Sequence, residues 1–193
     1  MDFWGNLFFM LNHLIQIFEQ ANKNLLSKDK ELFEVQVSER TLCGALMLHI
    51  YDILKRTEYR DYNIDVEYNR NKGGKLKTIS KTVKGTDEKI IKINCDLIVH
   101  SRGHNRFQDN LIAIEMKKSR RTQKDKEKDR ERLIALTKDS FNDIWSYDGK
   151  TLPEHVCRYK LGVYYEIDFC NKTIVLEYYV RGCYYDGKRL DLT

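Results

Sequence analysis

Two short apolar runs in the middle of this chain end in charged residues, and they constrain its fold more than any other feature. Residues 90–99 read Ile-Ile-Lys-Ile-Asn-Cys-Asp-Leu-Ile-Val, and residues 110–117 read Asn-Leu-Ile-Ala-Ile-Glu-Met-Lys. Both runs have the length and the Ile, Leu and Val content of buried strands. A charged side chain in such a strand is costly unless it is paired or binds a metal. Asp96, Glu115 and Lys117 are therefore predicted to form a polar site on a sheet.

The spacing of these residues points to a particular chemistry. Residues two apart in a strand face the same side, so Glu115 and Lys117 project together, and Asp96 on a neighbouring strand can join them. Two carboxylates supply the oxygen ligands that Mg²⁺ prefers, and the backbone carbonyl of Met116 would be a third ligand. A divalent ion lowers the pKa of bound water and stabilises charge on a phosphate, and Lys117 would orient the water or the phosphate. The pattern predicts metal-assisted hydrolysis of a phosphodiester, with Mg²⁺ or Mn²⁺ as cofactor.

Basic residues are concentrated directly after this predicted site. Residues 117–132 contain nine basic and four acidic residues, and the rest of the chain has 25 of each sign, so this segment carries the whole net charge of +5. A basic segment beside carboxylates suits a polyanionic substrate. Alternating charges also suit a solvated helix face, and charge alone favours that alternative. We expect phosphate contacts from Lys118, Arg120, Arg121 and Lys124.

Length and composition favour one globular domain spanning residues 1–193. The chain is 41% apolar and 33% charged and has one proline, which argues against a disordered or low-complexity protein. Its five cysteines are scattered, without a Cys-x-x-Cys pair or an accompanying His pattern. This usage fits a reducing cytoplasm and argues against a zinc site.

An apolar N-terminal segment is the second unusual feature. Residues 3–18 are rich in Phe, Leu and Ile but contain Asn, His and Gln, and they are too short for an ordinary transmembrane helix. Asp2 stands where a signal peptide would carry basic charge. We expect a helix over residues 1–22 that packs on the core, or on a partner protein or a second copy, and no membrane contact.

The remaining pattern predicts an α/β fold with a central mixed sheet flanked by helices. Residues 139–157 are irregular in pattern and include Pro153. The predicted elements, in chain order, are helices at residues 3–22 and 29–54, strands at 63–69, 75–84, 90–99 and 110–117, a helix at 122–138, and strands at 158–168 and 173–181.

Asp96, followed nineteen residues later by Glu115-Met116-Lys117, resembles the motif of the PD-(D/E)XK nuclease superfamily, particularly its small bacterial stand-alone members. The resemblance implies a restriction-endonuclease-like fold. It covers about residues 30–181, a nuclease-like core, and leaves the apolar N-terminal helix as an addition.

Further positions extend the resemblance, and one departs from it. Family members often carry a glutamate on the helix before the sheet, and Glu39 is the matching residue, which would reach the metal through water. Asp129, Arg132 and Leu133 fit the helix that follows the motif strand. Cys95 stands where many members have proline, which is not a ligand.

The resemblance implies a Mg²⁺-dependent endonuclease that cleaves DNA in preference to RNA. Small members of this superfamily often serve in restriction or anti-phage systems, where a partner controls the nuclease. The alternative is a catalytically inactive subunit that keeps the fold and binds nucleic acid or serves as a scaffold. The apolar helix at residues 1–22 would then dock on a partner or on a second copy.

Overall fold

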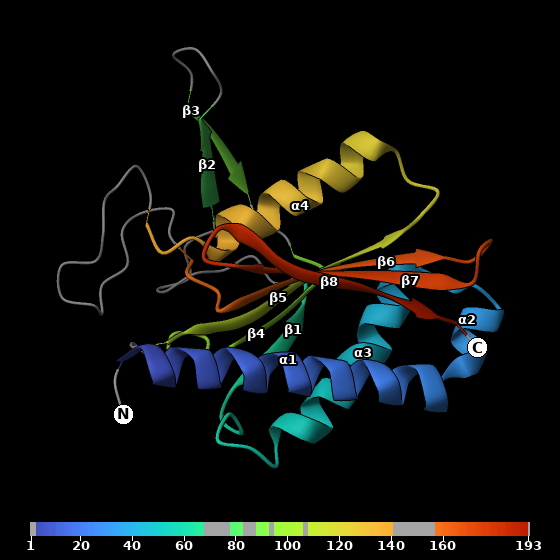
Figure 1. The fold of residues 1–193 in the computed structure, drawn as a ribbon, viewed down its shortest axis with the longest axis horizontal. Coiled ribbons are helices and arrows are strands. Elements are labelled where there is room, and N and C mark those ends of the chain that lie inside the picture. The colour runs from blue at the N-terminus through green and yellow to red at the C-terminus, as the bar shows by residue number, and fades with distance from the viewer. Residues whose placement is uncertain are drawn as a thin grey trace.

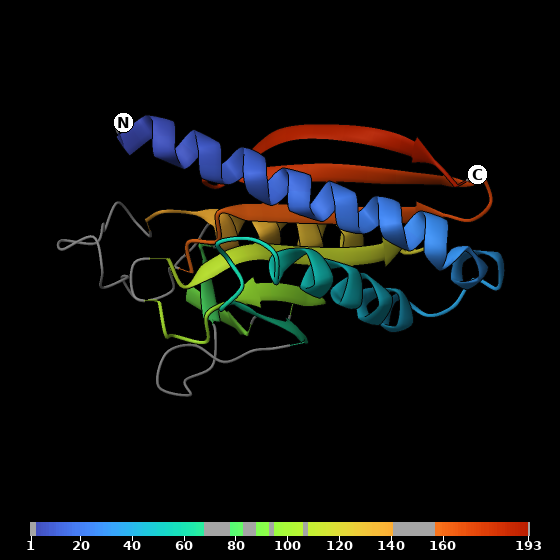
Figure 2. The ribbon, with the colours of Figure 1, turned by 90° about the horizontal axis from the view of Figure 1, so that it is seen from below.

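A six-stranded mixed sheet lies between helices on both of its faces (Figure 1). The computed structural model describes residues 3–67, 78–82, 88–92, 95–105, 108–140 and 157–192. Figure 2 shows α1 and α3 on one side of the sheet and α4 on the other. The predicted α/β class, with a mixed sheet flanked by helices, is confirmed.

The sheet has the strand order β1-β4-β5-β6-β7-β8. The β5 and β6 strands are parallel and the other neighbours are antiparallel. A parallel pair needs a crossover connection, and α4 supplies it between β5 and β6. The strands are β1 (Asn63–Val66), β4 (Leu97–His100), β5 (Asn110–Lys118), β6 (Leu161–Asp168), β7 (Thr173–Val180) and β8 (Cys183–Asp191).

Two apolar clusters pack against the two faces of the sheet. The larger one lies under α1 (Phe3–Lys28), α2 (Lys30–Glu34) and α3 (Glu39–Leu54). The smaller one lies under α4 (Gln123–Thr137) and contains Leu133 and Leu136 from the end of that helix. The first part of α4 therefore contributes little apolar surface to its contact with the sheet.

The long helix α1 is an integral part of the larger cluster. Phe18 is 0% exposed and packs edge to face on Tyr165 and Tyr178, with ring centroids 6.4 and 6.1 Å apart. Tyr165 also donates a 2.8 Å hydrogen bond to the Asn22 side chain. The helix continues to Lys28, beyond the predicted end at residue 22. Its apolar face is thus used largely within the chain.

Part of α1 stays uncovered near its N-terminal end. Phe8 and Phe9 are 61% and 67% exposed, so a partner for this end remains a prediction. Among the described residues, no helix has both the length and the apolar character needed to cross a bilayer.

Several predicted elements are divided or extended in the structure. The run at residues 90–99 is not one strand, because β3 (Glu88–Lys92) pairs with β2 (Thr78–Thr82) in a separate hairpin and only β4 joins the main sheet. The predicted helix at 29–54 is split into α2 and α3, and Ser38 caps α3 by accepting a 3.1 Å hydrogen bond from the Thr41 amide.

The last strand, β8, was not predicted, since the nuclease-like core was expected to end at residue 181. The sequence Tyr-Asp-Gly-Lys within β8 looks like a turn. Gly187 nevertheless lies within β8, and a Cβ atom there would come within 2.7 Å of the Tyr184 hydroxyl and 2.9 Å of the Leu176 carbonyl oxygen. A glycine therefore allows the close approach of β7 and β8 at this point.

Replacing Phe18 by alanine tests the role of α1 in the core. We expect Phe18→Ala to lower the free energy of unfolding by about 3–5 kcal/mol, because it opens a cavity between α1 and the sheet. The matched control, Phe9→Ala, should change it by less than about 0.5 kcal/mol. Urea unfolding followed by circular dichroism measures both. Equal effects of the two substitutions would mean that α1 does not pack as described.

Candidate active site

The register of β4 and β5 brings Asp96 and Glu115 side by side. Leu97 pairs with Ile114, so one residue further along Asp96 lies opposite Glu115, and directly opposed residues share a face of the sheet. The Met116 amide donates a 2.8 Å hydrogen bond to Asp96 Oδ2, which fixes this carboxylate against β5. The two acids singled out in the sequence thus lie together on the α4 face.

Lys117 lies on the same face, two residues beyond Glu115. Its Nζ is 3.2 Å from Asp129 Oδ2 on α4, and its side chain is 17% exposed. Burial alone would lower the pKa of Lys117, but the nearby carboxylates of Asp96 and Asp129 outweigh burial and raise it. Lys117 is therefore a protonated, charged group at neutral pH.

Two residues of α4 complete the cluster. Arg132 Nη1 donates a 2.6 Å hydrogen bond to Glu115 Oε1 and lies 3.3 Å from Asp129 Oδ1. The sequence predicts Asp129 and Arg132 on the helix that follows the strand of Glu115, but it does not indicate a role for them in the site. Their i, i+3 spacing, which puts both on one helix face, was the available signal.

The pKa values of the two strand carboxyls are raised. Burial is the main cause for Glu115, which is 0% exposed, and the adjacent Asp96 adds to it, so its pKa rises to about 8 despite the ion pair with Arg132. Burial likewise raises the pKa of Asp96, against the opposing effects of the Met116 amide and Lys117. An additional positive charge between the two acids would relieve this cost.

Two buried carboxylate oxygens in this cluster accept no hydrogen bond. In the described part of the chain, two buried side-chain oxygens accept no hydrogen bond, and both belong to this cluster: Glu115 Oε2 and Asp129 Oδ2. Buried polar atoms in native proteins nearly always have a partner, so each such exception asks for an explanation. Lys117 approaches Asp129 Oδ2 as an ion pair only. The side chains of Asp96 and Cys95 are the polar neighbours of the Glu115 carboxyl besides Arg132.

The donor set is small and made of oxygens. Among the described residues, no three His, Cys, Asp or Glu side chains come together as metal ligands. The Met116 side chain turns to the other face, where its sulfur lies 3.8 Å from Cys43 Sγ, so only its backbone can belong to the site. Two carboxylates and a carbonyl suit Mg²⁺, which keeps several waters, and do not suit a structural zinc ion.

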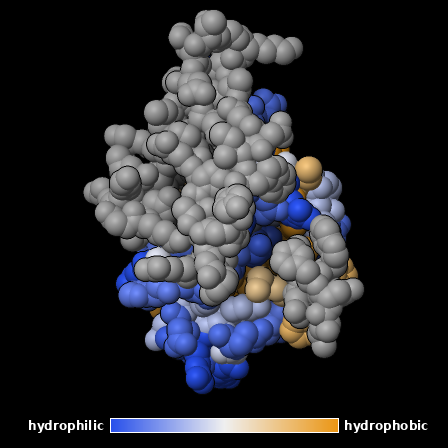
Figure 3. Space-filling model, turned by 90° about the vertical axis from the view of Figure 1, so that its left-hand side faces the viewer, coloured by the Kyte–Doolittle hydropathy of each residue, from blue (hydrophilic) through white to orange (hydrophobic). Residues whose placement is uncertain are grey.

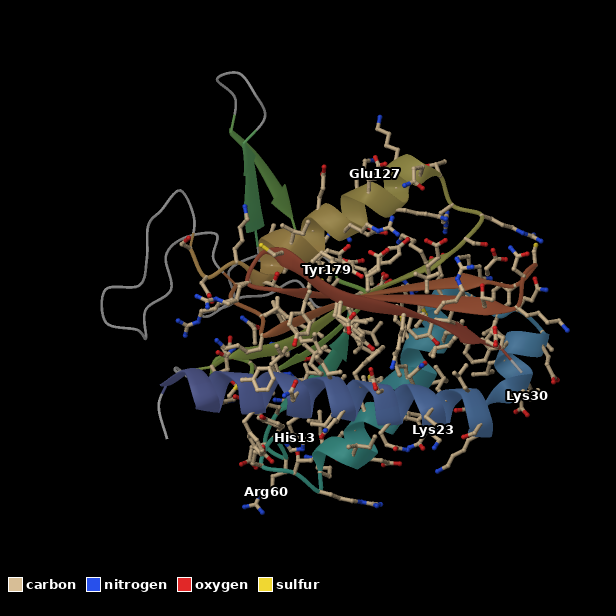
Figure 4. All side chains as sticks on the ribbon, viewed as in Figure 1. His13, Lys23, Lys30, Arg60, Glu127 and Tyr179 are labelled. Atoms are coloured by element: carbon tan, nitrogen blue, oxygen red, sulfur yellow. The ribbon has the colours of Figure 1, made fainter. Side chains whose placement is uncertain are left out.

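The cluster continues as a layer of ion pairs between α4 and the sheet, called here the polar layer. Lys126 lies 2.6 Å from Glu166, and Arg130 makes two 2.8 Å hydrogen bonds to Glu177. Figure 4 shows Tyr179 in this space and Glu127 on the outer side of α4. The polar layer holds five acids and four bases: Asp96, Glu115, Asp129, Glu166 and Glu177, and Lys117, Lys126, Arg130 and Arg132. Because the raised pKa keeps a proton on Glu115 at neutral pH, the remaining four acids are matched by the four bases.

The predicted glutamate of the preceding helix reaches the same strand at another point. Glu39 Oε1 accepts a 2.9 Å hydrogen bond from the Lys118 amide and lies 3.5 Å from Arg121 Nε. It approaches from α3, on the face opposite to Glu115. Its contacts fasten the end of β5 to α3, and a role towards a metal remains a prediction.

The four predicted phosphate-binding residues gather where β5 ends and α4 begins. Arg120, Arg121 and Lys124 are exposed, and Arg120 lies 3.7 Å from Cys170 in the turn between β6 and β7. Lys118 instead donates a 3.0 Å hydrogen bond to the Gln36 carbonyl. The basic segment is therefore divided: Arg120, Arg121 and Lys124 are open to solvent, whereas Lys126, Arg130 and Arg132 pair with acids in the polar layer.

No family model, curated protein or solved structure matches this chain.

The raised pKa of Glu115 gives a testable pH dependence. The folded carboxyl keeps its proton up to about pH 8, whereas the unfolded one loses it near pH ~4.3. Between these values the folded state binds more protons, so the free energy of unfolding falls as pH rises. In EDTA, we expect the free energy of unfolding to fall between pH 5 and 8 more steeply for the wild type than for Glu115→Gln. The difference in slope should be on the order of 1 kcal/mol per pH unit.

Urea titrations at several pH values measure this difference. Glu127→Gln on the outer side of α4 is the matched control and should follow the wild type. Parallel curves for the wild type and Glu115→Gln would contradict the assigned environment of Glu115.

Proposed function

We propose that this chain is a metal-dependent phosphodiesterase that acts on nucleic acid. The single observation that carries the proposal is the buried Glu115 carboxylate, which faces Asp96 and keeps one oxygen without a partner. A cation held between Asp96 and Glu115 would take the place of the proton that burial keeps on Glu115. Mg²⁺ or Mn²⁺ fits, with Asp96, Glu115 and the Met116 carbonyl as ligands.

The residues around the ligands would each contribute to hydrolysis. When bound, the divalent ion would supply an activated water and charge stabilisation at the phosphate. Lys117 has a raised pKa, so it would act as a charged donor that orients the water or the phosphate and not as a base. Arg132 and Asp129 would hold Glu115 and Lys117 in place from α4.

The order of elements supports a relationship to restriction-endonuclease-like nucleases. A helix with Glu39 precedes β1, β4 and β5, and a crossover helix then leads to the parallel strand β6. The predicted motif residues fall on β5 and directly before β4. By this resemblance we propose DNA as the substrate, cleavage by an endonuclease mechanism, and a role in restriction or anti-phage defence.

Substitutions in the cluster test the activity. We expect Asp96→Asn and Lys117→Ala to reduce Mg²⁺- or Mn²⁺-dependent cleavage of plasmid and single-stranded DNA by at least about 100-fold, since each removes charge that the reaction needs. Lys128→Ala is the matched lysine control, because Lys128 lies on the exposed side of α4 and pairs only weakly with Asp125 at 3.5 Å. Wild-type protein that cleaves nothing in any metal, or variants that cleave as well as wild type, would refute the proposal.

A second measurement tests the exposed bases at the start of α4. DNA binding is measured as a function of salt, in EDTA and with Asp96→Asn throughout, so that cleavage does not interfere. The double variant Arg120→Ala/Arg121→Ala should reduce the slope of log affinity against log salt by about two, because each lost phosphate contact removes roughly one released ion. Arg56→Ala/Arg60→Ala, beyond α3, removes the same charge and should leave the slope unchanged (Figure 4 labels Arg60).

One observation favours an inactive binding or scaffold subunit as the second candidate. Arg132 already occupies Glu115 Oε1, and Lys117 already pairs with Asp129, so most of the charge is balanced without a metal. Calorimetry with Mn²⁺ separates the two functions. Binding that is lost in Asp96→Asn supports the enzyme, and the absence of such binding supports the scaffold.

A further inference from the structure

A second site of a different kind lies at the other end of the sheet. A pocket of about 160 Å³ opens between the N-terminal part of α1, the residues that lead into β6, and the end of β7. The Lys160 amide donates to the Leu111 carbonyl, which places the pocket four residues along β5 from Glu115, or roughly 13 Å. It is therefore separate from the candidate active site.

The walls of this pocket are largely apolar. Phe8 and Leu11 of α1, Tyr159 and Val180 line it. A cavity of about 150 Å³ with such walls is known to accept a ligand of the size of benzene. Figure 3 views the molecule from this end, where hydrophobic and hydrophilic described residues both reach the surface.

One charged group in the pocket makes no direct ion pair. Asp139 is the acid that lines the pocket, and Arg181 holds it in an ion pair of 2.7 Å between Nε and Oδ2. Lys160 also lines the pocket and is partly buried, yet its Nζ makes no hydrogen bond or ion pair with any described residue. An anion in the pocket could therefore pair with this ammonium group without displacing an existing ion pair.

The electrostatic surroundings of Lys160 agree with this. Burial is the main cause that lowers the pKa of Lys160. The negative charge of Asp139 is the largest charge effect and opposes it, and the positive charges of Arg158 and Arg181 add to the lowering. The pocket therefore combines an apolar wall with a partly buried ammonium group, to which an anion could bind.

We propose that this pocket binds a small amphipathic anion, a carboxylate attached to an aromatic ring or a short aliphatic group. The carboxylate would pair with Lys160, and the apolar body would lie against Phe8, Leu11 and Val180. This inference does not rest on the proposed nuclease activity, because it uses none of the residues of the polar layer.

Benzoate is the probe, and its binding to the full chain is followed by chemical shifts in NMR spectra and by calorimetry. We expect the wild type to bind benzoate and Lys160→Met, which keeps the apolar stem, to bind it about tenfold or more weakly. Lys138→Met removes the same charge from an exposed position near Gly182 and should bind as the wild type does. Benzyl alcohol, which has the ring without the charge, should bind more weakly than benzoate.

A second variant tests the apolar wall without risk to folding. Phe8 is largely exposed, so Phe8→Ala should leave stability unchanged and weaken benzoate binding. Circular dichroism confirms that each variant is folded. Absence of benzoate binding to the wild type at millimolar concentration, or equal binding by folded Lys160→Met, would overturn the proposal.

Discussion

The ion pair between Arg132 and Glu115 joins α4 to the sheet. The candidate chemistry depends on this contact between the two layers. Glu115 is fully buried on the central strand β5, and Arg132 is the nearest positive charge on α4. A buried pair of this kind adds little net stability, because both ions lose their hydration. Its importance lies in geometry: the 2.6 Å hydrogen bond from Arg132 fixes the Glu115 side chain against α4. The position of α4 and the charge of the site are therefore coupled.

This coupling extends over the first two-thirds of α4. Leu133 and Leu136 anchor the end of the helix in apolar contacts, whereas Lys126, Asp129 and Arg130 hold its earlier turns through ion pairs. An ion-pair layer sets the angle and register of a helix more specifically than apolar contacts do, since each base must meet its own acid. The acids outnumber the bases at Asp96 and Glu115, where burial keeps a proton on Glu115 at neutral pH.

Much of the fold could be predicted from the sequence, because strand length, apolar content and turn residues are local signals. The site-bearing hairpin, the helix after it and the two strands that follow were found in this way. The break within residues 90–99 and the strand β8 were not, because each depends on which strand pairs with which. Gly187 shows this well: its neighbours suggest a turn, and only the proximity of β7 shows why a glycine stands there.

The candidate site could be predicted in part for a related reason. Asp96, Glu115 and Lys117 stood out because charge in an apolar strand is unusual. Asp129 and Arg132 did not, because they lie in a segment where almost every residue is charged. Which of those charges point inward is decided by the acids of β6 and β7, which come later in the chain.

The polar layer also limits how this protein can change over generations. A single substitution in it leaves an opposite charge partly buried and unpaired, whereas a simultaneous exchange of both partners keeps the charge balance. Positions such as 126 with 166, and 130 with 177, are therefore expected to vary together or not at all among relatives. The inner face of a helix that looks hydrophilic throughout would then be among the slowest-evolving surfaces of the molecule.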